Sequence, residues 1–152
     1  MHEFRQYAAL PYIEQDADIV VCLITSRDTG RWVIPKGWPK PDLAPHELAA
    51  REARQEAGLV GAVSAVPVGN YSYRKRLHFF LRVVCHVTVF PLLCDSQKLK
   101  WREKGERQLV WTTCDDAARR VDERELSRLL ADFPAWLVDA RDNVGHAPQR
   151  CP

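Results

Sequence analysis

The sequence has no apolar run of the length that a membrane-spanning helix needs, which is about 18 residues. Its first residues have neither a basic start nor a long apolar stretch, so we expect no signal peptide. No internal repeat or low-complexity linker interrupts the chain. We therefore expect a protein of the cytoplasm that has no membrane partner.

Cysteine is too scattered for a disulfide framework or a zinc site. The cysteines are odd in number, form no CxxC pair and are widely spaced: Cys22, Cys85, Cys94, Cys114 and Cys151. A large excess of one charge is also absent, because the formal net charge is only +2. A charge this small does not indicate a nucleic-acid partner.

The composition is that of an ordinary globular domain, with 46% hydrophobic and 28% charged residues in a chain of 152. We expect one domain at residues 1–140 and a disordered tail at residues 141–152. Apolar and β-branched runs predict strands at residues 6–13, 18–25, 31–34, 63–68, 69–74, 79–93 and 108–112. Helices are predicted from residue 44 or 45 to Gly58, at 115–120 and at 123–138. The chain is therefore expected to have an α/β fold.

The most informative segment runs from Gly37 to Leu59, with the sequence GWPKPDLAPHELAAREARQEAGL. A strand-like run precedes it, and Gly58 stands where a left-handed cap would end the predicted helix. Within that helix, Glu52 and Glu56 are four residues apart and lie on one face. Paired carboxylates with backbone oxygens nearby suit a hard divalent cation such as Mg²⁺.

This segment resembles the Nudix box, whose pattern is Gly, five residues, Glu, seven residues, Arg-Glu, an apolar residue, any residue, Glu-Glu, any residue, Gly and an apolar residue. The positions in register are Gly37, Arg51, Glu52, Ala53, Glu56, Gly58 and Leu59. Leu43 and Gln55 depart from the pattern, because they stand where glutamate is expected. The resemblance implies a Nudix-type α/β/α sandwich with a mixed β-sheet.

The resemblance also implies roles for residues of the box. Glu52 and Glu56 would ligate a divalent cation, with Mg²⁺ expected and Mn²⁺ as an alternative. Gly37 would add its backbone carbonyl, and one of the two glutamates would activate water. Gln55 can offer a carbonyl oxygen but no charge, so we expect weaker cation binding than a full box would give.

Arg51 would hold the glutamates and the loop in place, according to the same resemblance. Its usual partner is missing, because Leu43 cannot form an ion pair. Glu47 lies four residues before Arg51, which is a favourable spacing for an ion pair on a helix. We expect Glu47 to take over part of that role, with an ordinary exposed ion pair as the alternative.

Cations near the box are candidates for binding phosphate groups. Lys36 belongs to a Pro-Lys-Gly sequence that resembles the corresponding loop of Nudix enzymes acting on diphosphoinositol polyphosphates and diadenosine polyphosphates. A second basic cluster consists of Arg74, Lys75 and Arg76. Tyrosines stand at alternate positions just before this cluster, at Tyr71 and Tyr73. The segment resembles the basic strand of bacterial proteins grouped with diphosphoinositol polyphosphate phosphohydrolases. The alternative for this cluster is a solvated charged surface.

A further carboxylate is expected from a loop after the box, and either Glu103 or Glu106 could supply it. The first hypothesis is therefore Mg²⁺-dependent hydrolysis of a diphosphate linkage in a small phosphorylated substrate. That substrate would be a nucleoside diphosphate derivative, a dinucleoside polyphosphate or a diphosphoinositol polyphosphate. The second is a Nudix-fold protein that binds a phosphorylated ligand after losing most catalysis. The oligomeric state, monomer or homodimer, is left open.

Overall fold

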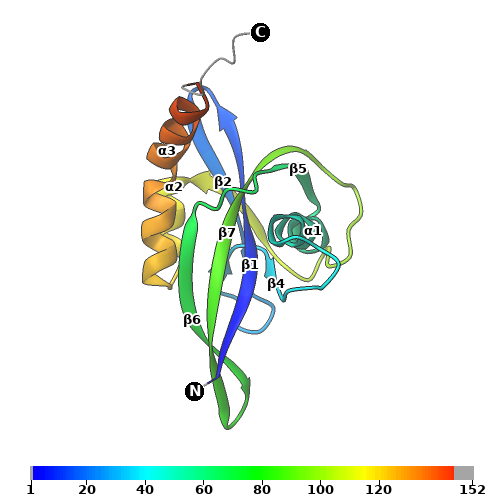
Figure 1. Cartoon of the computed structure of the whole chain (residues 1–152). Coiled ribbons are helices and arrows are strands. Elements are labelled where there is room, and N and C mark those ends of the chain that lie inside the picture. Colours follow the sequence, from blue (N-terminus) through cyan, green and yellow to red (C-terminus); the bar gives the residue numbers. More distant parts are fainter. Residues whose placement is uncertain (1, 146–152) are drawn as a thin grey trace.

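The computed structural model describes residues 2–145 and has three layers, with a central mixed sheet between helices (Figure 1). Helix α1 (Pro45–Ala57) covers one face, while α2 (Cys114–Arg120) and α3 (Arg124–Gly145) cover the other. The strands are β1 (Glu3–Gln15), β2 (Asp18–Thr25), β3 (Trp32–Val33), β4 (Lys36–Gly37), β5 (Leu59–Val63), β6 (Gly69–His78), β7 (Leu81–Gln97) and β8 (Leu109–Thr113). The expected α/β/α sandwich is confirmed.

Two long strands form the centre of the sheet. The main strand order is β3-β2-β1-β7-β5, with β4, β6 and β8 paired beside it. Strands β1 and β7 run parallel, from the pair Glu3 and Val84 to the pair Tyr12 and Leu93. The other pairings are antiparallel, so the sheet is mixed as expected.

Apolar side chains fill the spaces on both sides of the sheet. On the side of α3, Leu10 and Phe133 belong to the larger buried cluster. On the other side, Ala49 and Ala53 of α1 pack against Phe90 of β7. Because alanine side chains are short, α1 can lie close to the sheet, and its polar face stands beside β4.

One predicted strand is wrong. The prediction placed a strand at residues 63–68, whereas β5 ends at Val63 and starts directly after the cap of α1. Pro67 explains part of the difference, because proline has no N–H to donate to a strand ladder. Leu59 explains the rest, since it is buried against the sheet and draws the chain into pairing with the end of β7.

Several other predicted boundaries also differ from the structure, among them the start of β7 and the end of α3. The strand predicted to begin at residue 79 begins at Leu81, because Phe79 and Phe80 form the turn of the β6–β7 hairpin. Helix α3 continues through Gly145, so the tail expected from residue 141 does not start there. Residues 146–152 lie outside the described residues. No helix within residues 2–145 combines the length and apolar character needed to cross a membrane.

The C-terminal end of α1 is fixed by Gly58 and the loop that follows β7. Gly58 adopts a left-handed conformation with φ of 71°, and its N–H donates to the Arg54 carbonyl at 3.0 Å. The Gly58 carbonyl accepts from the N–H of Lys98 at 2.8 Å. A Cβ at position 58 would lie 2.4 Å from Cε3 of Trp101, so only glycine leaves room for that ring. This contact sets the position of the box helix against the loop.

We expect Gly58→Ala to destabilise the fold more than Gly30→Ala, with the difference exceeding about 1 kcal/mol. Both glycines have positive φ, so both substitutions carry the backbone cost of about 1–2 kcal/mol. A Cβ at position 30 would have no atom within 4 Å, whereas one at position 58 would meet Trp101. Urea unfolding of the two variants measures the difference. Equal losses would show that the Trp101 contact does not constrain the helix end.

Candidate active site

A cavity of about 700 Å³ opens between β4, α1, β6 and the loop after β7. Most of the residues proposed for the site border it: Lys36, Gly37, Glu52, Gln55, Glu56, Lys75, Glu103 and Glu106. These residues come from four separate segments of the chain, and the fold brings them to one place. Arg51, Arg74 and Arg76 are not among the residues that border this cavity.

Gly37 and Glu52 approach so closely that a larger residue at position 37 would push the Glu52 side chain out of its present place. A Cβ there would lie 2.4 Å from Cδ and 2.5 Å from Oε1 of Glu52. The carboxylate of Glu52 therefore rests against the backbone of β4. Burial is the main cause that raises the pKa of Glu52, and the nearby charge of Glu103 adds to the increase.

Glu56 is the most buried carboxylate of the cavity, with 6% of the residue exposed. Its Oε2 accepts the backbone N–H of Lys36 at 3.0 Å, and its Oε1 lies 2.8 Å from Nη2 of Arg107. Burial raises the pKa of Glu56 to about 8, although the Arg107 charge acts in the opposite direction. Glu56 thus joins α1 to β4 and to the loop before β8.

Arg107 is the main site residue that the sequence analysis missed. Its side chain is 9% exposed, and its Nη2 contacts both Glu56 and Glu103, the latter at 3.3 Å. Its Nη1 donates to the backbone carbonyl of Thr25 at 2.9 Å. The available signal was an arginine next to two glutamates in the loop that leads into a strand, but sequence alone does not show which way it points.

Glu103 is more closely integrated into the site than Glu106. Besides contacting Arg107, Oε1 of Glu103 lies 2.8 Å from Arg27, and its backbone N–H donates to the Gln55 carbonyl at 3.0 Å. Glu106 is half exposed, and its ion pair to Arg27 is longer, at 3.6 Å. Of the two carboxylates left open by the sequence, Glu103 therefore shares a cation with Glu56.

The predicted ion pair between Glu47 and Arg51 is wrong. Both side chains are exposed on α1, and no ion pair within 4.0 Å joins these two described residues. Water competes effectively for such exposed charges, so favourable helical spacing alone does not fix the pair. Arg51 still acts on its neighbour, because its charge lowers the pKa of Glu52 against the larger effect of burial.

The basic cluster at residues 74–76 is divided between two sides of β6. Side chains alternate along a strand, so Lys75 points with Tyr73 and not with Arg74 or Arg76. Nζ of Lys75 lies 5.7 Å from the ring centre of Trp38 beside the cavity. Arg74 and Arg76 border an adjacent cavity of about 590 Å³, which Lys75 also lines.

Lys36 belongs to both cavities. Its Nζ lies 5.2 Å from the ring centre of Tyr73. Burial lowers the pKa of Lys36, and the charge of Glu56 partly offsets this effect. The lysine thus connects the carboxylate end of the site to the basic strand.

The oxygen atoms at the site are of the kind that a hard cation binds, because Glu52, Glu56, Glu103 and the Gln55 amide all border one cavity. These oxygen atoms do not converge on one point in this structure. Within residues 2–145, no three acidic, histidine or cysteine side chains converge closely enough to hold a metal ion. Arg107 lies between Glu56 and Glu103 and forms an ion pair with each of them in this conformation.

A sequence model of the NUDIX domain matches residues 4–133. The chain belongs to the Nudix family. The family assignment made from the box is therefore confirmed. Nudix hydrolases generally use divalent metal cations.

Curated relatives cover most of the chain at low identity. Nudix hydrolase 16, mitochondrial, from Arabidopsis thaliana is 29% identical over 137 residues, which are 82% of this chain and 76% of that protein. Diphosphoinositol polyphosphate phosphohydrolase 2 from Rattus norvegicus is 28% identical over 118 residues, or 76% of this chain and 61% of that protein. Since one relative is mitochondrial, the cytoplasmic location stays a prediction.

Nudix hydrolase 21, chloroplastic, from Arabidopsis thaliana is 31% identical, and the match covers 76% of this chain but 57% of that protein.

Solved structures agree with this chain in fold. An Ap4A hydrolase binary complex from C. elegans has a TM-score of 0.66 at 19% identity, covering 90% of this chain and 98% of that one. The NUDIX domain of Shewanella oneidensis NrtR, complexed with ADP ribose, has a TM-score of 0.61 at 13% identity, covering 88% and 89%.

Replacing Arg107 by leucine should lower the free energy of unfolding by about 3–5 kcal/mol at pH 9, because it leaves the charged Glu56 buried without a cation. Adding Glu56→Gln should recover part of the loss, since a neutral amide needs no counter-charge. We expect a coupling of about 1–3 kcal/mol between the two positions in urea unfolding with chelator present. Additive losses would contradict the buried contact.

Proposed function

We propose that this Nudix protein hydrolyses a diphosphate linkage in a small phosphorylated substrate with the help of a divalent cation. Mg²⁺ is the proposed cofactor, and Mn²⁺ is the alternative. The observation that carries the proposal is the gathering of Glu52, Gln55 and Glu56 in one cavity with the lysines at positions 36 and 75 at its edge. The family membership and the names of the relatives support it.

The cation would be held by Glu52, Glu56 and the backbone carbonyl of Gly37, with oxygens of Gln55 and Glu103 close by. When bound, such a cation neutralises diphosphate charge and acidifies water. Such a cation would compete with Arg107 for Glu56, because both would use the same carboxylate. Arg107 would then be free to meet a phosphate oxygen of the substrate.

Glu52 is the proposed proton acceptor for the attacking water. Its raised pKa makes it a stronger base than an exposed glutamate, and its place against Gly37 fixes its direction. Arg51 is proposed as a positioning residue that acts on Glu52 through its charge. It is not placed against the substrate, because it lies outside the cavity.

Phosphate groups away from the reacting linkage would meet the basic side chains of β4 and β6. Lys36 and Lys75 border the carboxylate cavity, and Arg74 and Arg76 border the adjoining one. A substrate that spans both cavities is compatible with each of the three substrate classes: a nucleoside diphosphate derivative, a dinucleoside polyphosphate and a diphosphoinositol polyphosphate.

A specific observation also favours the second candidate, a protein that binds a phosphorylated ligand without efficient hydrolysis. An amide stands at position 55 where the Nudix pattern has a carboxylate, and Arg107 already forms ion pairs with two of the other carboxylates. Both features reduce the negative charge available for a cation. Turnover of a panel from the three substrate classes, with Mg²⁺ or with chelator, separates the two candidates.

On the best substrate of that panel, Glu56→Gln should reduce Mg²⁺-supported turnover by at least about 10²-fold, because it removes charge from the cation site. The amide keeps an oxygen for the Lys36 N–H, so the loop should stay in place. Glu47→Gln is the matched control, since Glu47 is exposed on the same helix and does not border the cavity. Equal turnover of wild type and Glu56→Gln at saturating Mg²⁺ would exclude Glu56 as a ligand.

Gln55→Glu should tighten Mg²⁺ binding about 5- to 30-fold, which corresponds to about 1–2 kcal/mol. The reason is that Gln55 borders the same cavity as Glu52 and Glu56, so its carboxylate would add charge near the cation. Gln108→Glu makes the same chemical change at an exposed position and should leave the affinity unchanged. Calorimetric titrations that superimpose for all three proteins would mean that position 55 does not reach the cation.

The affinity for Mg²⁺ should rise with pH up to about pH 8. Glu56 holds a proton below its pKa of about 8, and a cation must displace that proton in order to bind. Below this pH the affinity should increase by up to about tenfold per pH unit, and above it the increase should level off. Calorimetry in buffers of different ionisation enthalpy measures the released proton. An affinity that is flat between pH 6 and pH 8 would contradict this assignment.

A further inference from the structure

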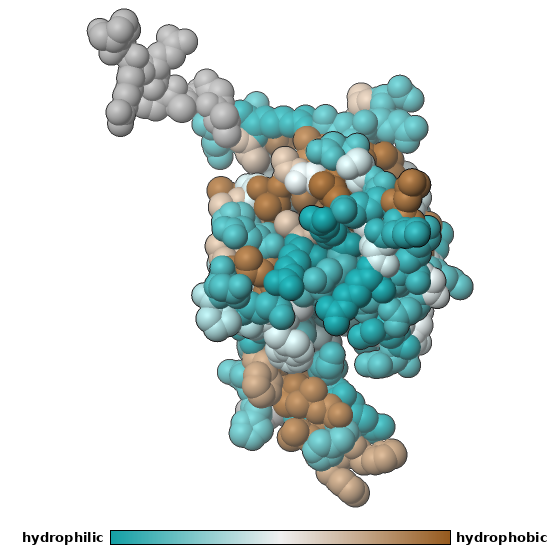
Figure 2. Space-filling view, turned by 90° about the vertical axis from the view of Figure 1, so that its right-hand side faces the viewer, coloured by the Kyte–Doolittle hydropathy of each residue, from teal (hydrophilic) through white to brown (hydrophobic). Residues whose placement is uncertain are grey.

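The hairpin formed by β6 and β7 carries exposed aromatic side chains at its tip. It extends from the body of the molecule beside the N-terminus (Figure 1). Phe79 and Phe80 form its turn and are 84% and 96% exposed, and Leu77 is 44% exposed. Figure 2 shows hydrophobic colour gathered on this protruding part of the surface. A projecting apolar group of this kind marks an interaction surface.

Cationic side chains lie directly behind the aromatic tip. Arg76 on β6 faces Arg82 on β7 across the hairpin, and Arg74 follows opposite Val84. At a rise of about 3.3 Å per residue, Arg82 is set back by about 7 Å from the turn. Arg76 lies opposite it, because a register shift between Arg76 and His78 takes up the extra residue of β6. No Asp or Glu occurs between residues 69 and 94. The acidic residue nearest in the sheet is Glu3, which contacts His86 at the base of the hairpin.

Both features are unfavourable for the isolated protein. Two arginines directly opposite each other on neighbouring strands repel. None of Arg74, Arg76 and Arg82 forms an ion pair within 4.0 Å to any described residue. A partner that covers the phenylalanines and supplies negative charge would remove both costs at once.

We propose that the tip of this hairpin inserts into the surface of an anionic membrane. Apolar side chains would enter the boundary between headgroups and acyl chains, which is about 5–10 Å deep, and the arginines would lie at the level of the lipid phosphates. The set-back of the arginines matches this depth. Such a contact needs no spanning helix, and it differs from our expectation that the protein has no membrane partner.

The order of the side chains favours a lipid surface over two other partners. A second copy of the chain would bring two sets of arginines together, so like charges would oppose a hairpin-to-hairpin contact. A single-stranded nucleic acid is held along a positively charged groove in which aromatic side chains stack on successive bases. Here both phenylalanines are at the tip of the hairpin and the cations lie behind them, nearer the body of the protein. A membrane surface requires this order, because its apolar interior lies beneath its charged headgroups.

The full chain should float with vesicles of phosphatidylcholine and phosphatidylserine in the presence of chelator, and should float poorly with phosphatidylcholine alone. Replacing Phe79 and Phe80 together by serine should weaken binding to the anionic vesicles at least about tenfold. Arg82→Glu should weaken it about 10- to 30-fold, because attraction becomes repulsion. Higher salt should weaken the binding of the wild type.

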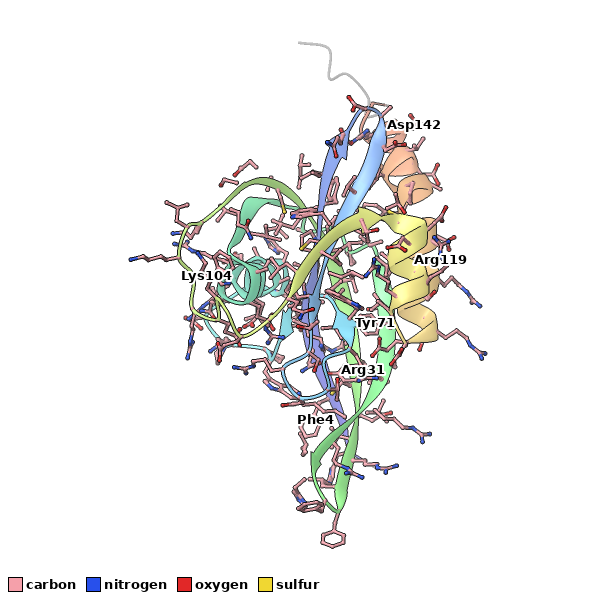
Figure 3. The ribbon with its side chains drawn as sticks, turned by 180° about the vertical axis from the view of Figure 1, so that it is seen from behind. Phe4, Arg31, Tyr71, Lys104, Arg119 and Asp142 are labelled. Carbon is pink, nitrogen blue, oxygen red and sulfur yellow. The ribbon has the colours of Figure 1, made fainter. Side chains whose placement is uncertain are left out.

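Two control variants change the same residue types elsewhere on the surface. Leu99→Ser removes an apolar side chain that is 86% exposed in the loop after β7. Arg119→Glu reverses a charge on α2, far from the hairpin in Figure 3, where the side chain is 73% exposed. Both controls should bind the vesicles like the wild type. The thermal midpoint of every variant is measured, and the comparison is confined to variants whose midpoint equals that of the wild type.

Three results would overturn the proposal. The first is wild-type protein that does not float with anionic vesicles. The second is a mass in light scattering that doubles with concentration and returns to one chain in the Phe79 and Phe80 double variant, which would assign the tip to a second copy. The third is binding to a single-stranded oligonucleotide, but not to vesicles, that the double variant loses.

Discussion

The side chain of Arg107 connects the segments on which the site depends. It contacts Glu56 of α1 and Glu103 of the loop after β7, and it donates to the Thr25 carbonyl at the end of β2. Because these groups are largely buried, the loss of one partner leaves a polar or charged group without compensation. One guanidinium thus connects the helix that carries the box, the loop after β7 and the end of β2.

The same contact limits the chemistry of the site. Arg107 occupies the carboxylate of Glu56. Under the proposed function, a divalent cation would compete with Arg107 for this carboxylate. This arrangement stabilises the cavity without metal, and it also reduces the charge that would attract one. Gln55 acts in the same direction, because an amide stands where the Nudix pattern has a carboxylate. Both features lower the negative charge that would bind a divalent cation. Whether the remaining carboxylates still bind one decides between the two proposed functions, hydrolysis and ligand binding.

The sequence was sufficient for the fold and for the box, because both depend on local patterns. Helix α1 begins at Pro45 and is capped by Gly58 as predicted, and β2 has its predicted bounds. Contacts between distant segments were not predictable in this way. The role of Arg107 and the choice of Glu103 over Glu106 depend on how the loop after β7 folds over α1, which no spacing in the sequence encodes.

The central claim is that the cavity hydrolyses a phosphoanhydride bond with a divalent cation. The most direct measurement is turnover of the substrate panel in ¹⁸O-labelled water, followed by mass spectrometry of the products. The account predicts that the label enters a phosphate group of one product, that this requires a divalent cation, and that chelator abolishes it. Tight binding of a phosphorylated ligand with no label in any product at saturating Mg²⁺ would contradict it and assign the cavity to ligand binding.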